Sequence, residues 1–119
     1  MKTVSEYRTL WVDALRSGTY PQAQRYLRRD TGFCCLGVLC DLVKDEVDGE
    51  WIEAYDGYAF LSGGARDNFG NRPRDTAALP LVIRDLVDLG TNLDVLMFMN
   101  DVDHKSFDEI ADYIEALPV

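Results

Sequence analysis

The segment GFCCLGVLCDLV, residues 32–43, limits the folds open to this chain more than any other stretch of its sequence. From Phe33 to Val43 it is apolar except for Asp41. A run of this kind forms either a buried strand or a buried helix. Its length, and its content of Leu, Cys and Gly in place of Val, Ile and Thr, favour a helix that is hydrophobic on most faces. We therefore predict a central buried helix, with Gly37 allowing another element to pack close to it.

All three cysteines lie in this segment, as Cys34, Cys35 and Cys40. A helix turns by about 100° per residue, so no two of the three thiols share a face. Cys40 also lies roughly 7.5–9 Å along the axis from the other two, which is too far for a disulfide. The C-x-x-C spacing of zinc sites is absent, and no metal site is expected. The simplest interpretation is that these are reduced cysteines acting as small apolar core side chains.

A cysteine hydrolase is the alternative interpretation of the same segment. Such enzymes place the nucleophile at a helix N-terminus, where the dipole stabilises the thiolate. Cys34 or Cys35, just after Thr31 and Gly32, would have that position. The base would have to be His104, the only histidine of the chain. This alternative predicts that one of the two thiols reacts in the folded protein.

Four further helices are expected outside this segment, at residues 5–18, 79–90, 91–101 and 106–117. Ser5 is the expected N-cap of the first, and Gly18 supplies the left-handed residue that ends it. Gly90 is expected to end the second. Ser106 and Glu109 match the S-x-x-E capping box at the start of the last helix. The expected core stripe of that helix consists of Phe107, Ile110, Ala111 and Ile114.

Between the helices the sequence predicts a small antiparallel sheet. Residues 51–54 and 58–61 are short aromatic runs around Asp56-Gly57, which is a strong hairpin signal. Residues 63–76 have no periodicity and are expected to form a loop, and loops of that length usually carry function or are disordered. Residues 22–30 fit either a helix or an extended segment. The predicted fold class is α+β: one mostly helical domain over residues 1–119, with a central buried helix and a small antiparallel β-hairpin or sheet.

Charge and hydropathy exclude several classes of function. The formal net charge is −9, which argues against binding to DNA or RNA because their phosphates would be repelled. No stretch approaches 18 apolar residues, so no membrane-spanning helix is expected. The N-terminus lacks the apolar region of a secretory signal, and the expected compartment is therefore the cytoplasm.

Positive charge is concentrated in two segments of this acidic chain. Residues 1–35 carry six Lys/Arg against three Asp/Glu, and residues 61–84 carry four against two. Arginine presents a planar fork that suits phosphate, and aromatic rings can stack on a base. The candidate ligand-binding residues are Arg25, Tyr26, Arg28 and Arg29 in the first segment, Arg66, Phe69, Arg72 and Arg74 in the second, and Trp51 between them.

These residues predict a phosphorylated small molecule, such as a nucleotide, as the ligand. Neither a P-loop nor the dinucleotide fingerprint accompanies them, so no cofactor is expected. The alternative interpretation is that they are ordinary surface arginines that pair with the abundant Asp and Glu.

Two acidic stretches, residues 45–56 and 101–115, suggest a different kind of binding. A calcium loop that started at Asp101 would have Lys105 and Ser106 where an EF-hand needs an oxygen ligand and a glycine. A turn that leads into a helix is the simpler interpretation. The acidic residues would then form a solvated face, which could also be presented to a basic host protein.

Three sequence blocks resemble an uncharacterised family of small phage and prophage proteins. The blocks are WVDALRSGTY at 11–20, FCCLGVLCDL at 33–42 and NDVDHKSFDEIADYIE at 100–115. The resemblance implies a phage or mobile-element origin and action in the bacterial cytoplasm, but it carries over no catalytic residue.

Small phage proteins that act outside the virion are often counter-defence factors, so the resemblance also implies a role by analogy. Some such proteins block a host protein with an acidic surface, and others sequester nucleotide signals as homo-oligomers. We therefore expect a non-enzymatic accessory protein that captures a phosphorylated small ligand, such as a host signalling nucleotide. The alternatives are an acidic inhibitor of a host protein and the cysteine hydrolase.

Overall fold

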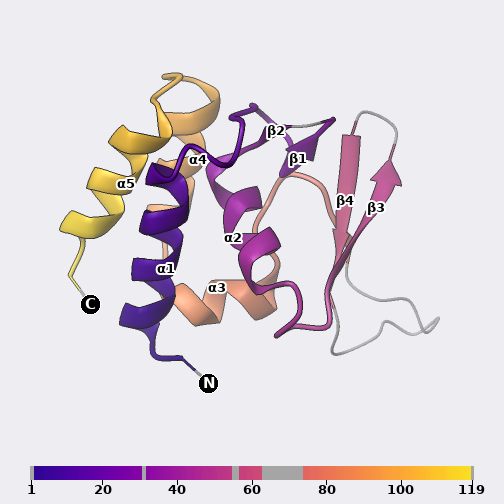
Figure 1. Ribbon diagram of the computed structural model, residues 1–119, viewed down its shortest axis with the longest axis horizontal. Coiled ribbons are helices and arrows are strands. Elements are labelled where there is room, and N and C mark those ends of the chain that lie inside the picture. The colour runs from indigo at the N-terminus through magenta and orange to yellow at the C-terminus, as the bar shows by residue number, and fades with distance from the viewer. Residues whose placement is uncertain (1, 31, 55–56, 63–73, 119) are drawn as a thin grey trace.

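The computed structural model describes residues 2–30, 32–54, 57–62 and 74–118, which form helices and one small antiparallel sheet (Figure 1). The helices are α1 (Val4–Arg16), α2 (Cys35–Val43), α3 (Leu81–Val87), α4 (Asn92–Asp101) and α5 (Phe107–Ala116). The strands are β1 (Arg28–Arg29), β2 (Gly32–Phe33), β3 (Glu50–Ala54), β4 (Gly57–Leu61) and β5 (Arg74–Asp75). This content confirms the predicted α+β class. Among the described residues, no helix is long and apolar enough to cross a membrane.

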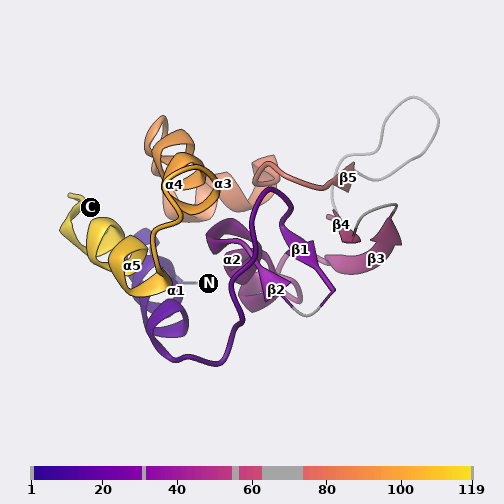
Figure 2. The same cartoon turned by 90° about the horizontal axis from the view of Figure 1, so that it is seen from above.

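Helix α2 lies between the helix pair α1 and α5 and the sheet, as two perpendicular views show (Figure 1 and Figure 2). Helix α1 packs against α5, α2 and α3, and α4 packs against α2 and α5. Within α2, every residue except Asp41 and Leu42 is buried. The predicted central buried helix is therefore confirmed.

Helix α2 begins later than the apolar run does. Gly32 and Phe33 form β2, and Cys34 is the N-cap of the helix, with an extended backbone (φ −79°, ψ 171°). The run thus contains the end of a strand as well as a helix. Hydrophobicity alone does not separate the two, because both parts are buried.

Gly37 is the point where another element approaches α2 most closely. A Cβ built on Gly37 would lie 1.7 Å from the carbonyl oxygen of Leu27. Leu27 is fully buried just before β1, and its carbonyl oxygen accepts a hydrogen bond from the backbone N–H of Cys34 (3.2 Å). The predicted close approach at Gly37 is confirmed, and the approaching element is the chain that enters the sheet.

The sheet has the strand order β2-β1-β4-β3, and β5 also pairs with β4. Strand β3 pairs with the whole of β4, so β1 and β5 lie end to end along the opposite edge of β4. The predicted hairpin is confirmed, with Ala54 paired to Gly57; residues 55–56 lie outside the described residues. Residues 22–30 were expected to form either a helix or an extended segment. Residues 28–29 of this range are extended, as strand β1.

The predicted loop at 63–76 needs a correction at its C-terminal end. Arg74 and Asp75 form β5, where Arg74 pairs with Leu61 and Asp75 with Phe60. This strand has no sequence signal, because two residues are too few to show alternation. Residues 63–73 lie outside the described residues.

Two predicted helix ends were wrong, and side-chain hydrogen bonds explain both. Thr3 caps α1 in place of Ser5: its Oγ1 accepts from the N–H of Glu6 (3.1 Å), and Glu6 Oε1 accepts from the N–H of Thr3 (3.0 Å). Helix α3 ends at Val87 and not at Gly90, because Asp88 adopts the left-handed conformation (φ 46°).

The buried side chain of Arg8 holds the end of α3. Its Nε donates to the carbonyl of Val87 (2.8 Å), and its Nη2 donates to the carbonyl of Asp88 (2.8 Å). Its Nη1 donates to the carbonyl of Pro118 (2.7 Å). One arginine of α1 therefore satisfies carbonyls at the end of α3 and near the C-terminus that would otherwise need water.

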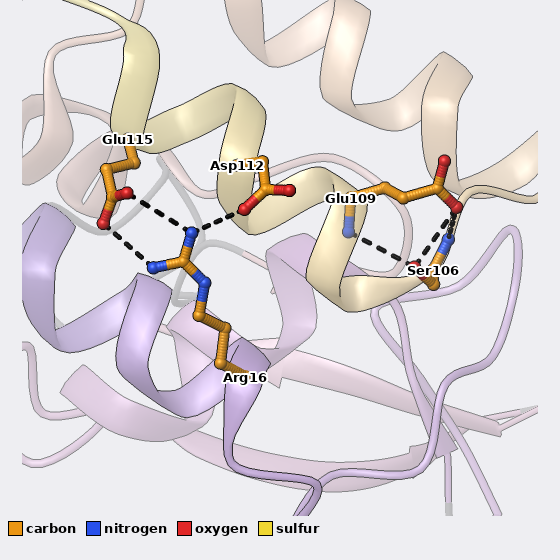
Figure 3. A network of polar contacts seen from close by, with 5 residues as sticks. All are labelled: Arg16, Ser106, Glu109, Asp112 and Glu115. Atoms are coloured by element: carbon orange, nitrogen blue, oxygen red, sulfur yellow. Dashed lines mark hydrogen bonds and ion pairs between the residues drawn. The ribbon is translucent and has the colours of Figure 1, made fainter.

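Helix α5 has the predicted capping box, with Ser106 and Glu109 bonded reciprocally (Figure 3). Asp112 and Glu115 are exposed, as predicted, yet both pair with Arg16 of α1, at 2.6 Å and 2.9 Å (Figure 3). Such exposed pairs add little stability. The two helices are held mainly by buried side chains, among them the predicted stripe Phe107, Ile110, Ala111 and Ile114.

The contact at Gly37 predicts a large effect of one methyl group. Gly37→Ala should lower the free energy of unfolding by about 3 kcal/mol or more, because the new Cβ meets a backbone oxygen that cannot move without breaking the Leu27–Cys34 hydrogen bond. This loss should appear although alanine favours helix over glycine by about 1 kcal/mol. Chemical denaturation followed by circular dichroism measures it.

Gly18→Ala is the matched control for that substitution. Gly18 has φ +75°, and a Cβ there would have no neighbour within 4 Å. The control should lose only about 1 kcal/mol from the left-handed backbone. Equal losses at the two positions would contradict the packing explanation.

Candidate functional site

One face of the sheet gathers an arginine and several aromatic rings. Strand pairing places Arg28 opposite both Phe33 and Tyr58, and Trp51 opposite Phe60. Directly paired residues project from the same face of a sheet, and residues two apart on one strand share a face. Tyr58 and Phe60 are two apart on β4, so all five side chains share one face. We call this set the Arg28 face.

Three rings of the Arg28 face, together with Tyr20, form a continuous chain of edge-to-face contacts. The ring centroids are 5.1 Å apart for Tyr20 and Phe33, 6.0 Å for Phe33 and Trp51, and 5.0 Å for Trp51 and Phe60. These distances lie in the range where aromatic pairs attract each other beyond their hydrophobic burial. Phe60 is fully buried, whereas Trp51 is partly exposed. The chain of rings therefore joins buried rings, Phe33 and Phe60, to the partly exposed rings of Tyr20 and Trp51.

The guanidinium of Arg28 lies against these rings. Its central carbon is 4.1 Å from the ring centroid of Tyr58, 5.2 Å from that of Phe33 and 5.7 Å from that of Trp51. All three distances are within the roughly 6 Å limit for attraction between a cation and a ring. Aromatic faces thus hold the cation in place.

Arg28 has unused hydrogen-bonding capacity. Its Nε is buried and has no hydrogen-bond partner among the described residues. No carboxylate of the described residues forms an ion pair with it, although the chain carries a net charge of −9. A guanidinium has five N–H donors, and buried polar groups normally have partners. The Arg28 face therefore combines a fixed cation with free donors.

The carboxylate of Asp41 on α2 orients two of the aromatic side chains. It accepts hydrogen bonds from the hydroxyl of Tyr20 (2.7 Å), the indole N–H of Trp51 (3.0 Å) and the ammonium of Lys44 (3.1 Å). Burial disfavours its charged form, but the three hydrogen bonds outweigh burial, and the pKa of Asp41 lies below its ordinary value. Burial and the bond to Asp41 raise the pKa of Tyr20 to about 12.

The structure separates Arg29 and Arg74 from Arg28. Arg29 follows Arg28 on β1, and Arg74 pairs with Leu61, which follows Phe60 on β4. Successive residues point to opposite faces, so Arg29 and Arg74 lie on the far face of the sheet. The guanidinium of Arg29 lies 5.2 Å from the ring of Tyr26. The two arginine segments thus meet along one edge of β4 but divide between its two faces.

The remaining candidates lie away from the Arg28 face or outside the described residues. Arg25 is exposed, and its backbone N–H donates to Asp101 at the end of α4 (2.8 Å). Arg66, Phe69 and Arg72 lie outside the described residues. Of the nine predicted ligand-binding residues, the structure brings Arg28 and Trp51 together on the Arg28 face.

The cysteines lie in the core and are free. Cys34 is the N-cap of α2, and its sulfur accepts from the N–H of Gly37 (3.4 Å). Burial outweighs this bond and raises the pKa of the Cys34 thiol to about 12, and it raises the pKa of Cys35 well above its ordinary value. A nucleophilic cysteine requires the opposite shift. His104 is exposed in the turn between α4 and α5, and the arrangement favours core cysteines over a hydrolase.

A family model for a domain of unknown function, DUF8296, matches residues 1–117. The chain belongs to this family. No curated protein and no solved structure matches the chain significantly. The DUF8296 match covers all three sequence blocks of the predicted resemblance. The phage or prophage origin that the resemblance implies stays a prediction. Among the described residues of this DUF8296 chain, no cluster of His, Cys, Asp and Glu is placed to hold a metal ion.

The sequence prediction omitted five residues of this site: Tyr20, Phe33, Asp41, Tyr58 and Phe60. Tyr58 lies in the second run of the predicted hairpin, but the sequence assigned no pairing register. The structure pairs Glu53 with Tyr58 and Trp51 with Phe60, which places Tyr58 on the same face as Trp51. Asp41 could have been identified from the sequence, because it is the one charged residue between Phe33 and Val43.

The lowered pKa of Asp41 predicts a pH-dependent contribution to stability. The folded-state pKa lies below the ordinary value of 3.8, so the stabilisation is complete above that pH and is lost as the pH falls through the folded-state pKa. Asp41→Asn should lower the free energy of unfolding at pH 7 by about 1–2 kcal/mol, a modest value because the site is partly exposed to solvent. Urea denaturation of both proteins between pH 3 and pH 7 should show the difference shrinking toward pH 3. A difference that stayed constant would contradict this role.

The raised thiol pKa values predict inert cysteines. Iodoacetamide at neutral pH should modify none of Cys34, Cys35 and Cys40 in the folded protein within the time that modifies all three in urea, because both burial and the low thiolate fraction prevent reaction. Intact-protein mass spectrometry counts the adducts. Rapid modification of Cys34 or Cys35 in the folded protein would instead support the hydrolase alternative.

Proposed function

We propose that this protein acts by binding, and that its ligand is a phosphorylated small molecule with a planar ring, such as a nucleotide. The observation that carries the proposal is Arg28, a cation fixed by aromatic rings that has no carboxylate partner among the described residues. In a chain of net charge −9, carboxylates are abundant, so an arginine without one is available to an external anion.

The geometry of a guanidinium supports the same ligand class. Attraction to a ring uses the flat face of the group, whereas its N–H donors point outward in its plane. Arg28 can therefore keep its contact with Tyr58 (4.1 Å) while its edge binds phosphate. The ring system of the ligand would stack on the partly exposed Trp51, whose orientation is set by Asp41. Such prior ordering reduces the entropy lost on binding.

The biological setting of the proposal comes from the sequence resemblance. We propose a phage-type accessory protein that works in the host bacterial cytoplasm and sequesters a host signalling nucleotide. Arg66 and Arg72 lie in the sequence between β4 and β5, and we retain them as predicted phosphate contacts. Arg74 is a predicted contact on the far face of the sheet, so it would serve a different ligand molecule or none.

An acidic inhibitor of a host protein is the second candidate, and one surface favours it. Helix α4 and its C-cap expose Val95, Phe98 and Val102, which are 41%, 53% and 59% accessible. Their spacing of three and four residues places them on one face. Asp94 and Asp101 lie beside them on α4. An apolar stripe among carboxylates suits a partner with an apolar centre and a basic rim.

Thermal unfolding with a panel of nucleotides tests the first candidate. The panel contains linear mono-, di- and triphosphates, cyclic mono- and dinucleotides, and ADP-ribose. A ligand present at 100 times its Kd should stabilise the protein by about 2.7 kcal/mol, which raises Tm by several degrees. Arg28→Ala should abolish the shift, and Arg28→Lys should weaken it because an ammonium lacks the planar fork.

Arg16→Lys is the matched control, because Arg16 is already paired with Asp112 and Glu115. It should leave the nucleotide shift unchanged. Circular dichroism confirms that each variant is folded. No shift with any member of the panel, or equal shifts with and without Arg28, would argue against nucleotide capture; loss of binding to a host protein in Phe98→Ser would then favour the second candidate.

A further inference from the structure

A separate pocket lies where the N-terminal end of α1, the connection between α2 and β3, and α3 come together. Its volume is about 700 Å³. Volumes of this size are typical of small-molecule sites. It shares no residue with the Arg28 face, so what it binds is independent of the proposed function.

One wall of the pocket is a polar network that is already satisfied. Glu46 accepts a hydrogen bond from the hydroxyl of Tyr7. It also forms an ion pair with the ammonium of Lys2 (3.1 Å). The Lys2 ammonium also lies 5.9 Å from the ring of Tyr7. In this ion pair the charges of Glu46 and Lys2 compensate each other. Neither group is left to bind a further ion.

The opposite wall comes from α3 and is mostly apolar. Val82, Asp85 and Leu86 line the pocket, and their spacing of three and four residues places them on one face of the helix. Val82 remains 38% exposed, and Leu86 is partly exposed. Val47, which is nearly buried, also lines the pocket. The pocket therefore has apolar surface that no described residue covers completely.

Asp85 supplies the one charge in the pocket that has no partner. It is exposed at the pocket, and it forms no hydrogen bond or ion pair with any other described residue. Lys2 and Glu46 cancel, so the described residues that line the pocket carry a net charge of −1. An anion would meet this charge and the −9 of the whole chain, whereas a cation would be attracted by both.

We propose that this pocket binds a small organic cation, an amine or guanidine with an aliphatic or aromatic body. Asp85 pairs with the cationic group. Val82, Leu86 and Val47 contact the body. The charge preference is the reverse of that of the Arg28 face, so the two sites do not compete for one ligand.

Three probes with the same hexyl chain test the charge preference: hexylamine, 1-hexanol and hexanoate. The observable is the methyl NMR shifts of Val82 and Leu86 in the full-length protein at 150 mM salt. Hexylamine should give saturable shifts at both residues, hexanol weaker ones, and hexanoate none. Equal binding of hexanoate, or hexylamine shifts spread evenly over the methyl groups of the protein, would overturn the proposal.

Paired variants distinguish binding in the pocket from the general attraction of a cation to an acidic protein. Asp85→Asn should weaken hexylamine binding by about two- to fivefold, the range of an exposed ion pair, and leave hexanol unchanged. Asp94→Asn removes the same charge from α4 and should have no effect. Val82→Thr should weaken both hexylamine and hexanol, whereas Val95→Thr, at a similarly exposed valine, should weaken neither. Equal effects of the two aspartate variants would overturn the proposal.

Discussion

The contact between the Leu27 carbonyl and Gly37 determines how close the sheet lies to the central helix. Because Gly37 has no side chain, the backbone before β1 passes directly over the first turn of α2. There the Leu27 oxygen accepts from Cys34, and the Leu27 N–H donates to the carbonyl of Thr76 (2.7 Å). The same residue thus joins α2 to the chain that follows β5. The burial of α2 depends on this arrangement.

A buried asparagine keeps the irregular segment before β1 in place. Asn100 of α4 is completely buried. Its Oδ1 accepts from the amide of Gln22 (2.9 Å) and the N–H of Cys35 (3.3 Å), and its Nδ2 donates to the carbonyl of Ala23 (2.9 Å). A segment without regular structure leaves backbone groups unpaired, and an apolar side chain could not satisfy them. Asn100 therefore links α4, the start of α2 and residues 22–23.

The Arg28 face is a consequence of these contacts. Arg28 comes directly after Leu27, so the packing of Leu27 against α2 also decides which face of the sheet Arg28 occupies. Asp41, four residues after Gly37 on α2, accepts hydrogen bonds from Trp51 and Tyr20. The sequence marked Arg28 and Trp51 as candidates from their chemistry. It could not divide the arginines between two faces, because that division depends on strands of two residues whose pairing is set by distant contacts.

The sequence by itself determined the elements whose signals are local. The apolar run, the capping box at Ser106 and the stripe from Phe107 to Ile114 predicted buried helices, because helix periodicity and caps are properties of neighbouring residues. Only the tertiary structure decided the end of α3, the short strands β1, β2 and β5, and the grouping of Arg28 with Phe33, Trp51 and Tyr58. Each of these depends on partners far along the chain, such as Arg8 for α3 and β4 for Arg28, and a local pattern contains no record of them.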